Sequence, residues 1–75
     1  MNRDRRKRLV AIVEQATQLQ EQLTAIQEEE QSALDNMPES LQGTDRYADM
    51  ETAAEALEEA TDGLFDIISG LEAIL

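Results

Sequence analysis

The stretch NMPESLQGTD, residues 36–45, holds the only cluster of helix-breaking residues in this 75-residue chain. Pro38 cannot continue a helix, and it disfavours the helical conformation at the residue before it. Asn36 is a residue type that readily takes the left-handed conformation at the end of a helix. Thr44 and Asp45 are common first caps of a new helix. The stretch therefore predicts a connector between two helices.

The segment before the connector has the seven-residue spacing of a coiled coil. One column of residues is Leu9, Ala16, Leu23, Glu30 and Met37, and a second is Ile12, Leu19, Ile26 and Ala33. Alternating steps of three and four residues place both columns on one side of a helix. The pattern predicts a helix from about residue 4 to about residue 35. We interpret the charged Glu30 as lying at the edge of a seam that drifts around the helix, rather than as a buried residue that sets the register.

The segment after the connector repeats the pattern. Its columns are Met50, Leu57, Leu64 and Leu71; Ala53, Ala60, Ile67 and Ile74; and Ala54, Ile68 and Leu75. They predict a second helix from about residue 45 to about residue 74. Gly63 and Gly70 share a column with Ala56, which indicates either a close approach of another helix or a solvent-facing column where glycine is tolerated.

Two long helices joined by a short connector predict an all-α fold, an antiparallel two-helix hairpin. Apolar stripes three columns wide would leave apolar surface in water, and the chain has no cysteine or histidine to stabilise so small a domain. We therefore expect two hairpins to pair as a homodimer, a four-helix bundle. The predicted interface consists of Leu57, Leu64, Phe65, Ile67, Ile68 and Leu71. Among these, Phe65 lies off the seam and is a candidate contact with the second subunit or with another partner.

The charges are distributed unevenly along the chain. It has 17 acidic and 6 basic residues, a net charge of −11, and five of the basic residues fall within residues 3–8. In a hairpin this basic segment lies beside the end of the second helix, where Glu72 is negative. A contact with nucleic acid or with an anionic membrane is the alternative, which the acidity of the remaining chain disfavours.

The second helix carries an acidic stripe at steps of three and four residues. It consists of Glu51, Glu55, Glu58, Glu59, Asp62 and Asp66. No lysine relieves the repulsion between these carboxylates. The stripe is either a solvated face that gives solubility or an imitation of a phosphate backbone that occupies a basic groove on a partner.

Several chemistries lack their residues in this chain. Without histidine or cysteine there is no serine or cysteine catalytic triad, zinc site or redox thiol, and no glycine-rich phosphate loop is present. The apolar runs are too short for a signal peptide or a membrane span. We expect a non-enzymatic cytoplasmic protein with no cofactor and no metal, which binds neither nucleic acid nor membrane directly. Its expected partners are a second copy of itself and an unidentified host protein, of basic charge if the acidic stripe binds it.

The segment EEEQSALDNMPESLQ, residues 28–42, resembles a group of small acidic proteins of unassigned role that are encoded by bacterial phages, prophages and other mobile elements. The resemblance implies a helical hairpin and a phage or prophage origin, and it carries no catalytic or binding residues. The leading hypothesis is a protein-binding homo-oligomer that serves as a phage accessory protein. The alternatives are an acidic DNA mimic that inhibits a host nucleic-acid-binding defence protein, and a structural coiled-coil segment of a larger assembly.

Overall fold

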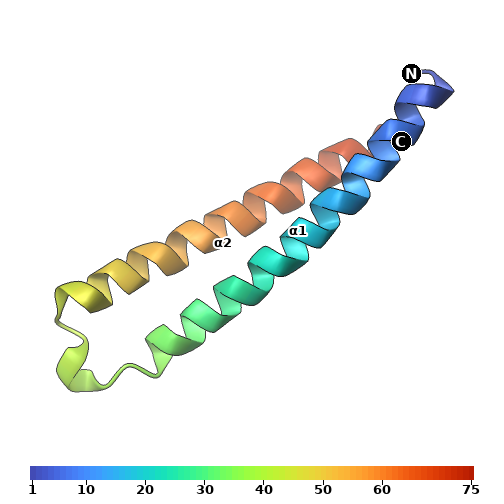
Figure 1. Cartoon of the computed structure of the whole chain (residues 1–75). Coiled ribbons are helices and arrows are strands. Elements are labelled where there is room, and N and C mark those ends of the chain that lie inside the picture. The colour runs from blue at the N-terminus through green and yellow to red at the C-terminus, as the bar shows by residue number, and fades with distance from the viewer.

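The computed structural model describes all 75 residues as two long antiparallel helices (Figure 1). Helix α1 spans Arg3–Asp35, a short 3-10 helix η1 spans Glu39–Leu41, and helix α2 spans Asp45–Glu72. The molecule is a rod whose principal extents are 59 × 14 × 14 Å. The all-α hairpin that the sequence predicts is confirmed.

Side chains and backbone groups fix the ends of the two helices. The Asn2 side chain accepts a hydrogen bond from the Arg5 backbone N–H at 2.8 Å, and Thr44 Oγ1 accepts one from the Tyr47 N–H at 3.3 Å. The expected left-handed conformation of Asn36 is wrong, because its φ is −91° and its ψ is 2°. In this conformation its N–H still bonds the Ser32 carbonyl, so α1 ends without a left-handed residue.

The contact between the helices uses two columns of residues on each. In α1 these are Leu9, Ala16, Leu23 and Glu30, a column that Met37 continues beyond the helix, and Val13, Gln20, Gln27 and Leu34; in α2 they are Met50, Leu57, Leu64 and Leu71, and Tyr47, Ala54, Thr61 and Ile68. All of these residues are buried or half-buried, whereas the positions that flank them are mostly exposed. Only four residues of the chain are buried, and each of them keeps 5–9% of its surface exposed, so the hairpin by itself has a thin core.

One of the predicted apolar columns in each helix lies outside the contact within the hairpin. Ile12, Leu19 and Ile26 of α1 are 50–56% exposed, and Ile67 and Ile74 in the C-terminal part of the chain are 58% and 57% exposed. Heptad spacing identifies the apolar side of a helix, but it does not say which of two adjoining columns meets the neighbouring helix. Here each helix is rotated so that the next column faces the other helix, the column of Val13 in place of Ile12 and the column of Ile68 in place of Ile67.

Polar residues fill the middle of the α1 side of the contact. The Thr24 hydroxyl donates to the Gln20 carbonyl at 2.8 Å, and in α2 the buried Thr61 hydroxyl donates to the Leu57 carbonyl at the same distance. No buried side-chain nitrogen or oxygen lacks a hydrogen-bond partner. Local bonds to the helix backbone therefore make these half-buried polar positions tolerable.

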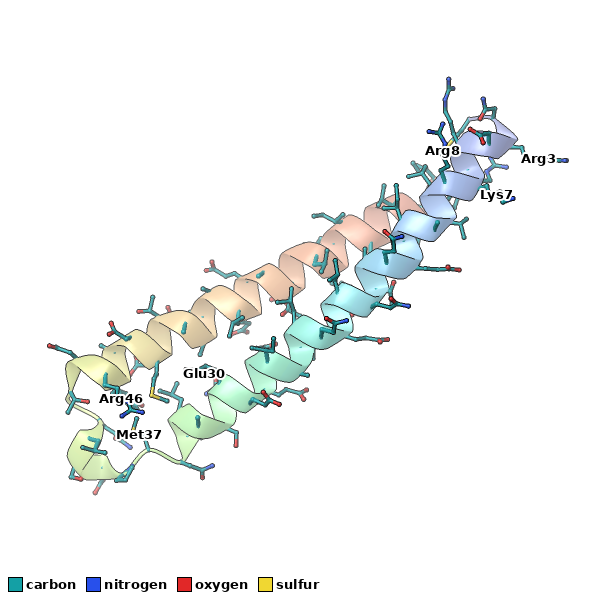
Figure 2. The ribbon with its side chains drawn as sticks, viewed as in Figure 1. Arg3, Lys7, Arg8, Glu30, Met37 and Arg46 are labelled. Atoms are coloured by element: carbon teal, nitrogen blue, oxygen red, sulfur yellow. The ribbon has the colours of Figure 1, made fainter.

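Glu30 belongs to the contact column and does not lie at the edge of it. It is half-buried, as are all the other members of its column from Leu9 to Met37, and Figure 2 shows it on the side of α1 that faces α2. The interpretation of a drifting seam is therefore wrong. The helices keep the seven-residue register along the whole contact, as helices do when they supercoil around one another.

The two glycines of α2 are not sites of close approach within the hairpin. A Cβ atom added at Gly63 or at Gly70 would meet no other atom within 4 Å. Both therefore lie in a column that faces open space in the isolated chain.

The Thr44 cap gives a test of the connector. Thr44→Ala should lower the free energy of unfolding by about 1 kcal/mol, because the first turn of α2 loses its side-chain acceptor. Thr52→Ala is the matched control, since the exposed Thr52 hydroxyl bonds only the carbonyl of Ala48 within its own helix. That change should be neutral or slightly stabilising. Urea denaturation at one protein concentration measures both, and equal effects would contradict the capping role.

Candidate interaction surfaces

The antiparallel hairpin has two broad faces, which are defined by their place relative to the contact. Successive residues of a helix are turned by about 100°. Helix α2 runs opposite to α1 and also faces it. For this reason the residue that precedes a contact position in the sequence lies on the same side of the hairpin in both helices. The residue that follows a contact position lies on the other side in both helices. The reference positions are Val13, Gln20, Gln27 and Leu34 in α1 and Ala54, Thr61 and Ile68 in α2.

The residues one step before these positions form an apolar face. They are Ile12, Leu19, Ile26 and Ala33 in α1 and Ala53, Ala60 and Ile67 in α2, and Ile74 continues the column beyond the end of α2. Every one of them is exposed. The small column of Ala56, Gly63 and Gly70 lies beside them on α2. This surface has no charged residue in either of its two main columns between residues 12 and 33 and between 53 and 74.

The residues one step after the same positions form an acidic face. They are Glu14, Glu21, Glu28 and Asp35 in α1 and Glu55 and Asp62 in α2, with Ser69 completing the column. All are exposed. The hairpin therefore carries its exposed isoleucine and leucine columns on one side and these carboxylate columns on the other.

The predicted acidic stripe lies only in part on this face. All six of its residues are exposed, but Glu59 and Asp66 come two residues after the contact positions Leu57 and Leu64 and so lie on the back of α2. Sequence reasoning missed the α1 carboxylates of the acidic face. Their signal was the seven-residue spacing of Glu14, Glu21 and Glu28, which could have been found in the same way as the apolar columns.

The six predicted interface residues separate into three places. Leu57, Leu64, Ile68 and Leu71 belong to the contact with α1 within the chain, and Ile68 is only 7% exposed. Ile67 lies on the apolar face. Phe65 is 59% exposed and lies toward the acidic face, because residues two apart on a helix point in nearly opposite directions. One flat interface therefore cannot include both Phe65 and Ile67.

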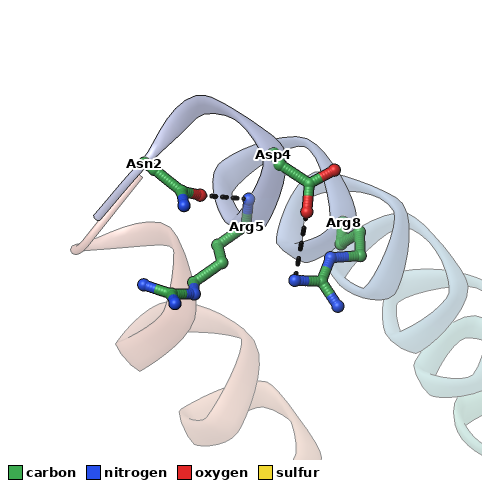
Figure 3. Close-up of polar contacts among 4 residues, drawn as sticks. All are labelled: Asn2, Asp4, Arg5 and Arg8. Atoms are coloured by element: carbon green, nitrogen blue, oxygen red, sulfur yellow. Dashed lines mark hydrogen bonds and ion pairs between the residues drawn. The ribbon is translucent and has the colours of Figure 1, made fainter.

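The basic segment of residues 3–8 extends past the end of α2 (Figures 1 and 2). Its only ion pair joins Arg8 to Asp4 within the same helix at 3.1 Å, with both side chains more than two-thirds exposed (Figure 3). Such a pair contributes at most a few tenths of a kcal/mol. Glu72, the expected neighbour of the segment, makes no ion pair with it. The basic side chains are therefore available to another molecule.

Shallow depressions occur at the two ends of the rod. Arg5, Arg8, Leu9 and Ile12 line the one near the termini, and Met37, Leu41, Thr44 and Arg46 line the one at the connector. The structure gathers no group of three or more acidic side chains in a geometry that could hold a metal ion. Neither helix combines the length and the apolar character that crossing a membrane requires.

Comparisons with protein-family profiles, with curated proteins and with solved structures found no match to this chain.

The acidic face predicts that salt stabilises the fold. Carboxylates one or two turns apart repel one another, and an ionic strength of about 0.15 M already shortens the screening length to about 8 Å. Raising the sodium chloride concentration should therefore raise the melting temperature measured by circular dichroism. A variant with Glu14→Gln, Glu21→Gln and Glu28→Gln is the control, and its melting temperature should respond less to salt. An equal response would show that repulsion on this face does not limit stability.

Proposed function

We propose that this chain is a non-enzymatic, protein-binding protein that works as a homodimer. Two hairpins pack their apolar faces together into a four-helix bundle, and their acidic faces remain outside. The observation that carries the proposal is the apolar face itself. Five isoleucine and leucine side chains on it, Ile12, Leu19, Ile26, Ile67 and Ile74, are each at least half exposed in the single chain.

The direction of the apolar stripes supports this assembly. In α1 the contact with α2 includes the polar residues Gln20, Gln27 and Glu30, while Ile12, Leu19 and Ile26 lie outside it. The apolar stripe of α1 is thus centred between α2 and the apolar face. A helix of a four-helix bundle packs against two neighbours, so its stripe points between them. The stripes of both helices have this direction toward the same face.

The surface area of the hairpin also supports a second subunit. The chain exposes 5680 Å². A compact monomer of 8.4 kDa exposes about 4,600 Å² by the usual scaling of area with mass. The excess of about 1,100 Å² exceeds the roughly 800 Å² that each partner buries in a stable interface of standard size. An elongated hairpin with four buried residues therefore has enough spare surface to supply such an interface.

A pair of matched substitutions tests the apolar face. Ile67→Asp should convert the dimer into a monomer, because it places an unpaired charge in the proposed interface at a cost of several kcal/mol. Phe65→Asp makes the same kind of change two residues away, on the other side of α2, and should leave the dimer intact. Sedimentation equilibrium at micromolar concentration measures both.

Three results would contradict the homodimer or its face. A wild-type chain that sediments as a monomer at micromolar concentration would exclude the homodimer. Dissociation by Phe65→Asp but not by Ile67→Asp would place the interface on the acidic side. Equal loss of the dimer in both variants, with loss of helicity, would show that the substitutions act on folding and not on one face.

A second candidate function concerns the acidic face, as a mimic of nucleic acid that occupies the basic groove of a host defence protein. It is supported by the parallel carboxylate columns of the two helices and by the exposed Phe65 that they surround. An aromatic side chain with a charged rim has the composition of a binding hot spot. The resemblance of residues 28–42 to phage and prophage proteins agrees with such a role. A structural coiled-coil segment remains the alternative in which the acidic face only solubilises the assembly.

Competition with duplex DNA tests this second function. Proteins captured by the immobilised chain from a bacterial lysate at low salt should be released by duplex DNA and by high salt. A variant with Glu55→Gln and Asp62→Asn, both on the acidic face, should capture much less of them. The control is a variant with Glu29→Gln and Asp49→Asn, away from the acidic face, which should capture as much as the wild type. Capture that neither DNA nor salt reverses would exclude mimicry.

A further inference from the structure

The two ends of the hairpin differ in charge. The end that holds the termini carries the exposed basic residues Arg3, Arg5, Arg6, Lys7 and Arg8, and Figure 2 shows Arg3, Lys7 and Arg8 on the part of α1 that extends past α2. The connector end carries the exposed acids Asp35, Glu39, Asp45, Asp49 and Glu51, with Arg46 as its one base. No ion pair within the chain neutralises either end, apart from the local pair of Arg8 with Asp4.

The apolar face is graded in side-chain size along the same axis. Ile12 and Leu19 belong to the first half of α1, and Ile67 and Ile74 to the last nine residues of the chain, so all four lie in the half of the antiparallel hairpin that holds the termini. Ala33 and Ala53 lie toward the connector, where Ile26 is the one large residue, and Ala60 lies near the middle of α2. Protein interfaces and cores are close-packed, and they reach that density when large side chains meet small ones across the contact.

We propose that the two hairpins of the dimer pack with their connectors at opposite ends, so that the basic segment of each chain lies against the acidic connector end of the other. This orientation rests on the proposed homodimer, in which a second copy of this chain covers the apolar face. It sets large apolar residues against small ones and opposite charges against each other. The reverse orientation, with both connectors at one end, sets two basic segments together and two acidic ends together, which is unfavourable.

Arg5 and Arg8 are the basic residues best placed for this contact. Arg5 precedes Ile12 by seven residues and so continues the column of the apolar face, and both arginines line the depression beside Leu9 and Ile12. In Figure 3 the Arg5 guanidinium lies apart from the ion pair of Asp4 with Arg8. At the connector end, Asp49 lies in the column of Ala56, Gly63 and Gly70, beside the apolar face.

Energy transfer between labelled chains tests the orientation, since the chain has no cysteine of its own. Ser40→Cys labels the connector and Ser69→Cys labels the other end, and both serines are exposed. With donor on Ser40→Cys and acceptor on Ser69→Cys, mixed dimers should show strong transfer. With both dyes on Ser40→Cys, transfer should be weak, because the labels lie at opposite ends of a rod 59 Å long.

The outcomes separate the orientation from the homodimer. Strong transfer between two Ser40→Cys chains, with weak transfer between Ser40→Cys and Ser69→Cys chains, overturns the orientation and leaves the homodimer standing. A monomer in sedimentation overturns both. A dimer in sedimentation without transfer in either pair overturns the orientation as well, because the chains then meet in another way.

Charge exchange tests the contact between the ends. Arg5→Glu with Arg8→Glu should raise the dissociation constant of the dimer several-fold, while circular dichroism should show the helix retained, since acidic residues suit a helix N-terminus. Mixing this chain with one that carries Glu39→Arg and Asp49→Arg should restore a heterodimer. A chain with Glu14→Arg and Glu21→Arg on the acidic face is the control and should not restore it. Failure of the first mixture, or success of the control, overturns the end-to-end contact.

Discussion

The rotation of each helix about its own axis is the constraint on which both faces of the hairpin depend. The chain turns Val13, Gln20 and Gln27 toward α2, so the residues before them face one side of the rod and the residues after them face the other. A rotation by one residue would bury Ile12, Leu19 and Ile26 between the helices. The hairpin would then bury more apolar area between its own helices and would have no apolar face. Its carboxylates would lie on the sides of the helices that point away from the contact.

The exposed isoleucines and the polar contact residues are therefore two consequences of one arrangement. Gln20 and Gln27 are half-buried at the contact, and the hydroxyls of Thr17 and Thr24 bond the helix backbone nearby. These residues make a contact that is adequate but weak, because little apolar area is buried there. The larger apolar side chains remain free for a neighbour outside the chain. A helix pair built in this way is better suited to form one half of the proposed four-helix bundle than to be a stable domain by itself.

The sequence was sufficient for the hairpin and insufficient for its rotation. Pro38 and Thr44 define the connector through local backbone chemistry, which does not depend on the rest of the molecule, and the Thr44 cap is found as expected. The choice between Ile12 and Val13 as the contact residue depends on tertiary packing, and an apolar pattern with both columns filled does not decide it. The same ambiguity applies to Ile67 and Ile68, of which Ile68 packs against α1 and Ile67 lies on the apolar face. The α1 half of the acidic face was visible in the spacing of Glu14, Glu21 and Glu28, but its meaning required knowing which column faces α2.

A net charge of −11 on each chain would ordinarily oppose self-association. The two-faced hairpin avoids this difficulty through distance. When apolar faces meet, the acidic faces point away from each other and are separated by the thickness of two helix layers, about 20 Å for helices with their side chains. That distance exceeds the screening length of about 8 Å at physiological ionic strength, so the repulsion between the two acidic faces is largely screened. The charges that lie close across the proposed interface are those at the ends of the rod. There Arg5 and Arg8 of one chain meet the acidic residues around the connector of the other. In the proposed dimer, the segregation of charge thus lets a small acidic chain keep a strongly negative outer surface while its apolar face packs against a second copy.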